Sequence, residues 1–187
     1  MKKNTNQLNV YSAIHTILEH IGEDPTRDGL KETADRMVRS WDELLCGYRS
    51  NPAELFKLFD SEGYNEMIIL KNIEFYSMCE HHFLGFHGVA HVAYIPKDKI
   101  IGISKLARLV EVFSHRLQVQ ERLTMQIANT LVKYLKPVGA GVILEGGHSC
   151  MGCRGVKNKN TKMITSMLKG SFLQPKVRQE FLALSMK

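Results

Sequence analysis

The stretch MIILKNIEFYSMCEHHFLGFHGVAHVAYIP, residues 67–96, decides the fold. Residues 67–78 are rich in β-branched and aromatic side chains and contain no Gly or Pro, a composition typical of a strand. Residues 87–96 favour a second strand, in which the side chains of Val89, His91, Ala93 and Ile95 would alternate with those of Ala90, Val92 and Tyr94. The glycine-containing segment 81–88 between them predicts a hairpin connection. The stretch therefore predicts two neighbouring antiparallel strands.

Helical patterns precede and follow this hairpin. Before it we expect two amphipathic helices, at residues 8–21 and 30–45, joined by a linker at 22–29. A short further helix is expected at residues 50–59. After it we expect two helices, two strands and a last helix, beginning near Ser104, Glu121, Gly141, Thr161 and Pro175. We find no internal repeat. This order predicts an α+β fold with an antiparallel sheet.

Length and composition restrict the class of protein. The chain has 187 residues, 44% of them hydrophobic and 24% charged, which is typical of one globular domain. The sequence contains no run of about eighteen apolar residues, so we expect no membrane span. The N-terminal segment carries two lysines but no apolar signal core, so we expect mature cytoplasmic protein.

The net charge of +6 indicates an anionic partner. Only the run KNKNTK, residues 157–162, is densely basic, and we interpret it as a solvated loop. No basic patch with interleaved aromatic residues is present in the sequence. We therefore expect a local phosphate site rather than a nucleic-acid surface.

The four cysteines indicate metal or thiol chemistry rather than disulfides. They are Cys46, Cys79, Cys150 and Cys153. A disulfide-stapled secreted domain would be smaller and richer in cysteine. Three of these cysteines lie in two clusters with histidines, CEHH at 79–82 and GGHSCMGCRG at 146–155.

Two sets of metal ligands are possible. Cys79 and His82 together with Cys150 and Cys153 would give the closed four-ligand pattern of a structural zinc site. Without Cys153, three ligands would leave a fourth position open, which is the catalytic pattern. A hydrolytic site also needs groups that move protons, and His81 and His148 flank the ligands. These two histidines favour the catalytic interpretation, and a non-catalytic protein with a structural Cys3His site stays the alternative.

Basic side chains could form the phosphate site. Ser104 is a candidate N-cap, and Lys105 and Arg108 would add charge at the start of its helix, where free N–H groups attract anions. Arg154 follows the second cluster. Each of these cations could equally be an ordinary solvated charge.

Gln120 and Glu121 open the following helix. A carboxylate can accept hydrogen bonds from the ring N–H and the exocyclic amine of guanine, a donor pair that adenine lacks. A glutamate at this position is also explained by the helix dipole alone. The spacing does not choose between the two.

Three motifs carry a resemblance to a known family. CEHH at 79–82, then VAYIPKDKIIGISKLARLVEVFSHRLQVQERLTMQIA at 92–128, then HSCMGCRG at 148–155, resemble GTP cyclohydrolase I. The resemblance runs from about residue 30 to the C-terminus. It implies zinc-dependent hydrolysis and ring rearrangement of GTP to 7,8-dihydroneopterin triphosphate and formate, the first step of pterin and folate biosynthesis.

The resemblance also implies a role for each candidate residue. The zinc ligands would be Cys79, His82 and Cys150, and the catalytic residues His81 and His148. The triphosphate would be bound by Lys105, Arg108 and Arg154, with Ser104 nearby and Arg36 contributed by a neighbouring subunit. Guanine would be recognised by Gln120 and Glu121.

The fold implied by the resemblance is the tunnelling fold. It has a four-stranded antiparallel sheet with helices on one face, here preceded by an N-terminal helical region. We expect that region to cover residues 1–60 and the catalytic region residues 61–187. In the family, sheets of several subunits close into a barrel and two pentamers form a homodecamer, which also removes exposed sheet edges.

Overall fold

The computed structural model describes residues 5–185 and divides the chain into two compact units, Met1–Leu45 and Cys46–Lys187. The boundary expected near residue 60 lies fifteen residues earlier in the structure. Residues 46–60 belong to the second unit, because the 3₁₀ helix η1 (Cys46–Arg49) packs on the helix α3 (Ile103–Ser114), and strand β1 (Leu58–Asp60) pairs with β4 (Lys99–Ile101).

The first unit is a pair of helices, α1 (Thr5–His20) and α2 (Thr33–Leu44), at the places predicted by the hydrophobic pattern. Its small core contains Ile14, Leu18 and Ala34, all less than a tenth exposed. The Tyr11 hydroxyl donates a hydrogen bond of 2.8 Å to Asp35 across the two helices.

The second unit is built on a five-stranded sheet in the order β5-β2-β3-β6-β7. Four strands are antiparallel, as predicted: β2 (Ile68–Cys79), β3 (Gly85–Ile95), β6 (Gly139–His148) and β7 (Met163–Gly170). The fifth strand, β5 (Leu117–Gln118), was not predicted; it pairs in parallel with the end of β2. The segment lies between the two helices expected to begin near Ser104 and Glu121, and two residues are too short for a periodic pattern.

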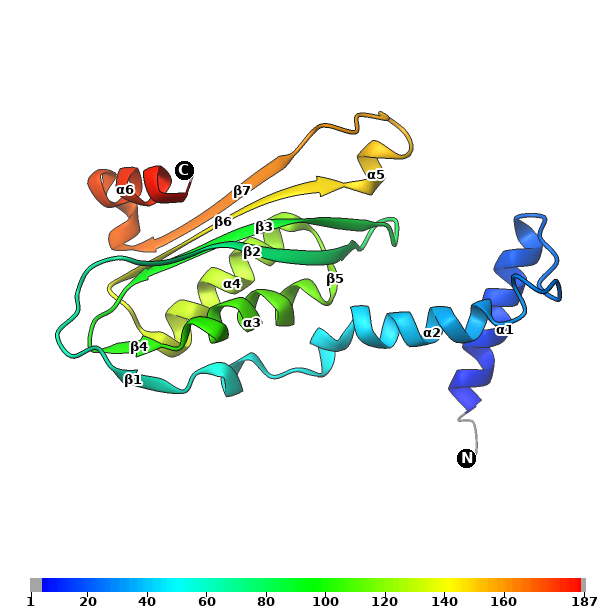
Figure 1. The fold of residues 1–187 in the computed structure, drawn as a ribbon, viewed down its shortest axis with the longest axis horizontal. Helices are drawn as coiled ribbons and strands as arrows, with labels where there is room; N and C mark the ends of the chain where they lie inside the picture. Colours follow the sequence, from blue (N-terminus) through cyan, green and yellow to red (C-terminus); the bar gives the residue numbers. More distant parts are fainter. Residues whose placement is uncertain (1–4, 186–187) are drawn as a thin grey trace. The chain divides into compact units, whose positions relative to one another are not determined.

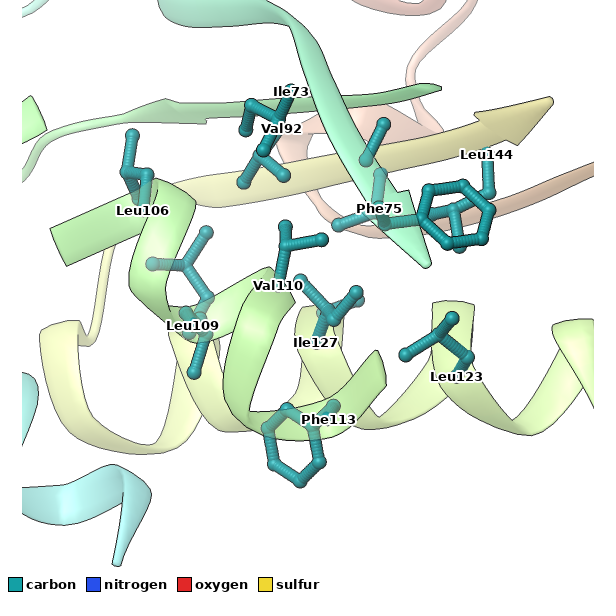
Figure 2. Close-up of a cluster of buried hydrophobic side chains, with 14 of the residues drawn as sticks. Ile73, Phe75, Val92, Leu106, Leu109, Val110, Phe113, Leu123, Ile127 and Leu144 are labelled. Atoms are coloured by element: carbon teal, nitrogen blue, oxygen red, sulfur yellow. The ribbon is translucent and has the colours of Figure 1, made fainter. Parts of the chain in front are cut away.

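Two long helices, α3 and α4 (Gln120–Leu135), cover one face of this sheet (Figure 1). Figure 2 shows Leu109 and Val110 of α3 and Ile127 of α4 meeting Phe75 and Val92 of the sheet. These side chains are almost inaccessible to solvent, so their burial stabilises the layer by about 1.5–3 kcal/mol each. None of the described helices is long and apolar enough to cross a membrane.

The C-terminal helix α6 (Pro175–Ser185) lies on the opposite face of the sheet, which differs from the expected arrangement with helices on one face only (Figure 1). Phe181 of α6 and Phe172 of the 3₁₀ helix η3 (Ser171–Leu173) form a second core with Ala93 and Ile143. Alternate strand residues point to opposite faces, so the helix covers apolar side chains that α3 and α4 cannot reach.

Two local expectations differ from the structure. The N-cap of α3 is Gly102, and the Ser104 side chain, inside the first turn, makes no capping hydrogen bond. The segment 50–59 contains a 3₁₀ helix, η2 (Pro52–Leu55), followed by β1, rather than one short helix. Asn51 caps η2 through a hydrogen bond from Ala53 N–H to its side-chain oxygen.

We predict that Gly141→Ala destabilises the second unit. A Cβ atom at this position would lie 2.6 Å from a ring carbon of Phe172 and 2.8 Å from one of Phe181. Overpacking of this kind costs about 1–3 kcal/mol, so the midpoint of urea denaturation should fall. Gly147→Ala is the matched control, because nothing lies within 4 Å of its added Cβ. Equal midpoints for the two variants would contradict the packing argument.

Candidate metal centre and active site

The connection between β2 and β3 is a tight loop that places two candidate ligands side by side. The Cys79 carbonyl accepts hydrogen bonds from the backbone N–H groups of His82 and Phe83, at 3.3 and 2.9 Å, and Cys79 N–H donates to the Leu84 carbonyl. Phe83 adopts a left-handed backbone conformation with φ of 54° to close the loop. As a result Cys79 Sγ and His82 Nδ1 lie 3.7 Å apart.

The third candidate ligand comes from the segment after β6, at the same end of the sheet as the β2–β3 loop. Strand β6 ends at His148, which lies opposite Phe86 of β3, and the short helix α5 (Ser149–Gly152) follows at once. Cys150 is thereby brought to the loop, so that the sulfur atoms of Cys79 and Cys150 and a ring nitrogen of His82 all lie within 4.8 Å of one another.

This group fits zinc. Tetrahedral zinc with a sulfur and a nitrogen ligand places those two atoms about 3.6 Å apart, close to the distance between Cys79 and His82. Sulfur and imidazole donors also suit zinc, whereas magnesium and calcium prefer oxygen ligands. Among residues 5–185, no fourth cysteine, histidine or carboxylate joins the group. Cys153 is exposed and outside it, which favours the three-ligand site over the four-ligand structural alternative.

The electrostatics of the two sulfur atoms favour a cation. Burial raises the pKa of the Cys150 thiol, and the nearby Cys79 sulfur raises this pKa further. Two adjacent thiolates repel each other in a partly buried position, and a divalent cation between them removes that repulsion.

Glu80, inside the ligand loop, is tied to the helical layer. Its backbone N–H donates to the Gln118 carbonyl over 3.1 Å, and its carboxylate pairs with the Arg122 guanidinium. Arg122 Nε also donates to the side-chain oxygen of buried Gln118, 3.1 Å away. The sequence holds no local signal for this brace, because its contacts depend on the pairing of β5 with β2.

The two remaining histidines occupy different environments. His81 is exposed, with Nδ1 4.0 Å from Cys79 Sγ. His148 is half-buried, its ring stacks on Phe86 with centroids 4.6 Å apart, and its Nε2 lies 3.0 Å from Gln120 Oε1. Burial lowers the pKa of His148, while the charge of Glu121 opposes this shift. The lowered pKa favours the neutral ring of His148, the form that can accept a proton.

A cavity of about 590 Å³ opens beside His148. Its size falls in the range of about 300–1,000 Å³ typical of small-molecule sites. Ser149, Cys153, Lys159 and Lys162 are among the residues that line it. The KNKNTK run is exposed, as the solvated-loop interpretation predicted, but two of its lysines also form part of this wall.

The other predicted site residues lie in several different environments. Glu121 and Arg154 are exposed, whereas Gln120 is only 1% exposed, with its side chain inside the protein. Ser104, Lys105 and Arg108 lie in the first turns of α3, and among residues 5–185 no hydrogen bond or ion pair joins their side chains to the metal group. Arg36 lies in the first unit and pairs with Glu32.

Two thiols and an imidazole that could hold a metal ion, with His81 and His148 close to them in the sequence, make this a candidate metal centre. Comparison with known proteins identifies the family. The chain belongs to the GTP cyclohydrolase I family, whose sequence model matches residues 10–186.

Three relatives illustrate the similarity, and each is called GTP cyclohydrolase 1. The protein of Chlorobium chlorochromatii is 51% identical over 181 residues, which cover 96% of this chain and 81% of that one. The protein of Wolinella succinogenes is 50% identical, covering 90% and 91%. The protein of Caldanaerobacter subterraneus is 48% identical, covering 94% of both chains.

One solved structure, the archaeosine synthase QueF-Like in the apo form, aligns with 56% of this chain and 93% of its own. The sequence identity is 15% and the TM-score 0.47, too low to bear on the fold.

We predict that Arg122→Gln weakens zinc binding by roughly tenfold, as expected when a group that holds the ligands in place is lost. Without the guanidinium, Glu80 loses its ion pair and the ligand loop becomes less rigid. Competition with a chromophoric chelator would measure the affinity. Lys133→Gln, an exposed position on the same helix, is the control. Unchanged affinity in Arg122→Gln would show that the brace does not hold the loop.

We predict that Cys153→Ser keeps one zinc ion per chain, since Cys153 lies outside the ligand group. Metal analysis of the purified variant beside Cys150→Ser, which should lose most of its zinc, would measure this. Comparable zinc loss in both variants would instead favour the four-ligand structural site.

Proposed function

We propose that this protein converts GTP and water to 7,8-dihydroneopterin triphosphate and formate. The observation that carries the proposal is the three-ligand group of Cys79, His82 and Cys150 beside two spare histidines, in a member of the GTP cyclohydrolase I family. Such a group has the ligand count of a catalytic metal site rather than a structural one.

The metal is proposed to be zinc, held by the two sulfur atoms and the imidazole. When bound, zinc would supply Lewis acidity that makes water a nucleophile near neutral pH. The reaction needs this because carbon 8 of guanine must be hydrolysed and released as formate.

His148 and His81 are proposed to move protons. Attack at carbon 8 becomes easier when the neighbouring nitrogen 7 is protonated, and breaking the imidazole ring requires further proton transfers to nitrogen. His148 lies beside the cavity, and its lowered pKa favours the neutral ring, so it is suited to exchange protons with a substrate. His81 is exposed and close to the ligand Cys79, which allows it to share this role.

The remaining site residues are proposed to bind the nucleotide. Lys105, Arg108 and Arg154 would neutralise the triphosphate, with Ser104 near it. Glu121 is exposed, and its carboxylate could accept the two hydrogen bonds that distinguish guanine from adenine.

The finer architecture is part of the same proposal. We propose the tunnelling fold and a cytoplasmic homodecamer of two pentamers, in which Arg36 reaches the site of a neighbouring subunit. Two features support closure of the sheet through neighbours. Strand β7 is an edge of the sheet, and Ile164 on it is 57% exposed, so pairing with another subunit would cover both.

The first prediction of this proposal is turnover of GTP by the zinc-loaded protein. Formate should be released together with a product that shows neopterin absorbance after oxidation and dephosphorylation. His148→Ala should lower the rate by about 10²–10⁴-fold, the usual contribution of a proton-transfer residue, with zinc still bound. Formate assay, absorbance and metal analysis measure the three quantities.

Absence of turnover by fully metallated, assembled protein would contradict the proposed activity. A non-catalytic member of the family with a zinc-stabilised fold would then be the better description. Full activity of His148→Ala would leave the reaction in place and remove His148 from it.

A further inference from the structure

Gln120 is the first residue of α4, and its buried side chain joins three elements. Its Nε2 lies 3.1 Å from the Leu144 carbonyl of β6 and 2.9 Å from the Met163 carbonyl of β7. It also lies 3.1 Å from Thr165 Oγ1, and Gln120 Oε1 lies 3.0 Å from His148 Nε2. With 1% of its surface exposed, this amide has no side-chain atom left for a substrate.

The partners of the amide fix its orientation. Backbone carbonyls only accept hydrogen bonds, so the atom facing Leu144 and Met163 must be the NH₂ group. Oε1 is then the atom that faces His148, and an oxygen of this kind accepts only. His148 Nε2 therefore carries a proton and donates it, and in the neutral ring Nδ1 is left unprotonated.

The hydroxyl groups nearby support the same orientation. Thr124 Oγ1 donates to the Gln120 carbonyl over 2.7 Å, which uses its only proton. The contact of 2.6 Å between Thr124 and Thr165 must then have Thr165 as donor, so Thr165 Oγ1 is free to accept from the Gln120 amide. Every proton in this network has an acceptor.

The backbone leaves space for this contact only because residue 146 is glycine. A Cβ atom there would lie 2.6 Å from Gln120 Oε1, and the amide cannot move aside without giving up its bonds to Leu144 and Met163. On the other side, the Phe86 ring lies almost parallel to the His148 ring, at an angle of 7°. His148 is thus held by a hydrogen bond at one nitrogen and by stacking on its face.

We propose that Gln120 is a positioning residue that orients His148 and holds its Nε2 proton, rather than a residue that recognises guanine. The proposal rests on the proton-transfer role of His148 in the proposed function. Nδ1 becomes the ring nitrogen that exchanges protons with the substrate. Base recognition then falls to Glu121, the exposed neighbour of Gln120.

Two variants approach this contact from opposite sides. Gln120→Met removes the amide but keeps the size of the side chain. Gly146→Ala keeps the amide and displaces its oxygen from His148. Gly85→Ala is the control for added volume, because the nearest atom to its Cβ is 3.9 Å away.

Steady-state kinetics with GTP separate positioning from recognition. Loss of positioning should lower kcat by about 10–100-fold in both variants, part of the usual contribution of a proton-transfer residue, with KM changed by less than about twofold. Zinc content should stay at the wild-type level. A raised KM with unchanged kcat would overturn the inference and return Gln120 to base recognition.

A second readout does not depend on activity. Diethyl pyrocarbonate modifies unprotonated imidazole nitrogen, and peptide mass spectrometry reports its rate at His148. The rate should rise severalfold in Gln120→Met and in Gly146→Ala, and not in Gly85→Ala. Equal modification rates at His148 in all proteins would overturn the inference even if GTP turnover is found. If the wild-type protein does not turn over GTP but the modification rates rise in the two variants, only the proposed reaction is overturned.

Discussion

The register between β3 and β6 is the constraint on which the candidate site depends. Phe86 lies opposite His148, and this pairing brings the loop after Cys79 next to the start of α5, about seventy residues later in the chain. Side chains alternate between the two faces of a strand, so a slip by one residue would turn His148 away from Gln120. The ligand group, the stacked histidine and the cavity all follow from one alignment of two strands.

This register is itself specified from both faces of the sheet. Val92 and Leu144 point into the core beneath α3 and α4, whereas Ala93 and Ile143 point to the core beneath α6. A slipped pairing would exchange the side chains of the two cores, which differ in size and depth. The helix α6 on the second face, whose position the sequence pattern does not predict, therefore contributes to the precision of a site that it does not touch.

The sequence predicted those parts of the fold and site that depend on periodicity and on adjacent residues. The hairpin follows from the composition of residues 67–96, and the pair Cys79 and His82 from their spacing within one loop. The parallel strand at Leu117–Gln118 could not be predicted, because its evidence is the tertiary contact itself. The resemblance assigns Gln120 to guanine recognition, although the helix pattern already indicates that its side chain points into the protein. Residue 120 lies three and seven positions before the buried Leu123 and Ile127, on the inward face of α4.

Gly146 shows how a helix can dictate the composition of a strand. The space at this position is taken by a side chain that lies 26 residues earlier in the sequence, and a methyl group would compete for it. In descendants of this chain, residue 146 could gain a side chain only after residue 120 had become shorter or had found other hydrogen-bond acceptors. The two positions therefore form a coupled pair under mutation, and the order of substitution would matter: the helix must change before the strand.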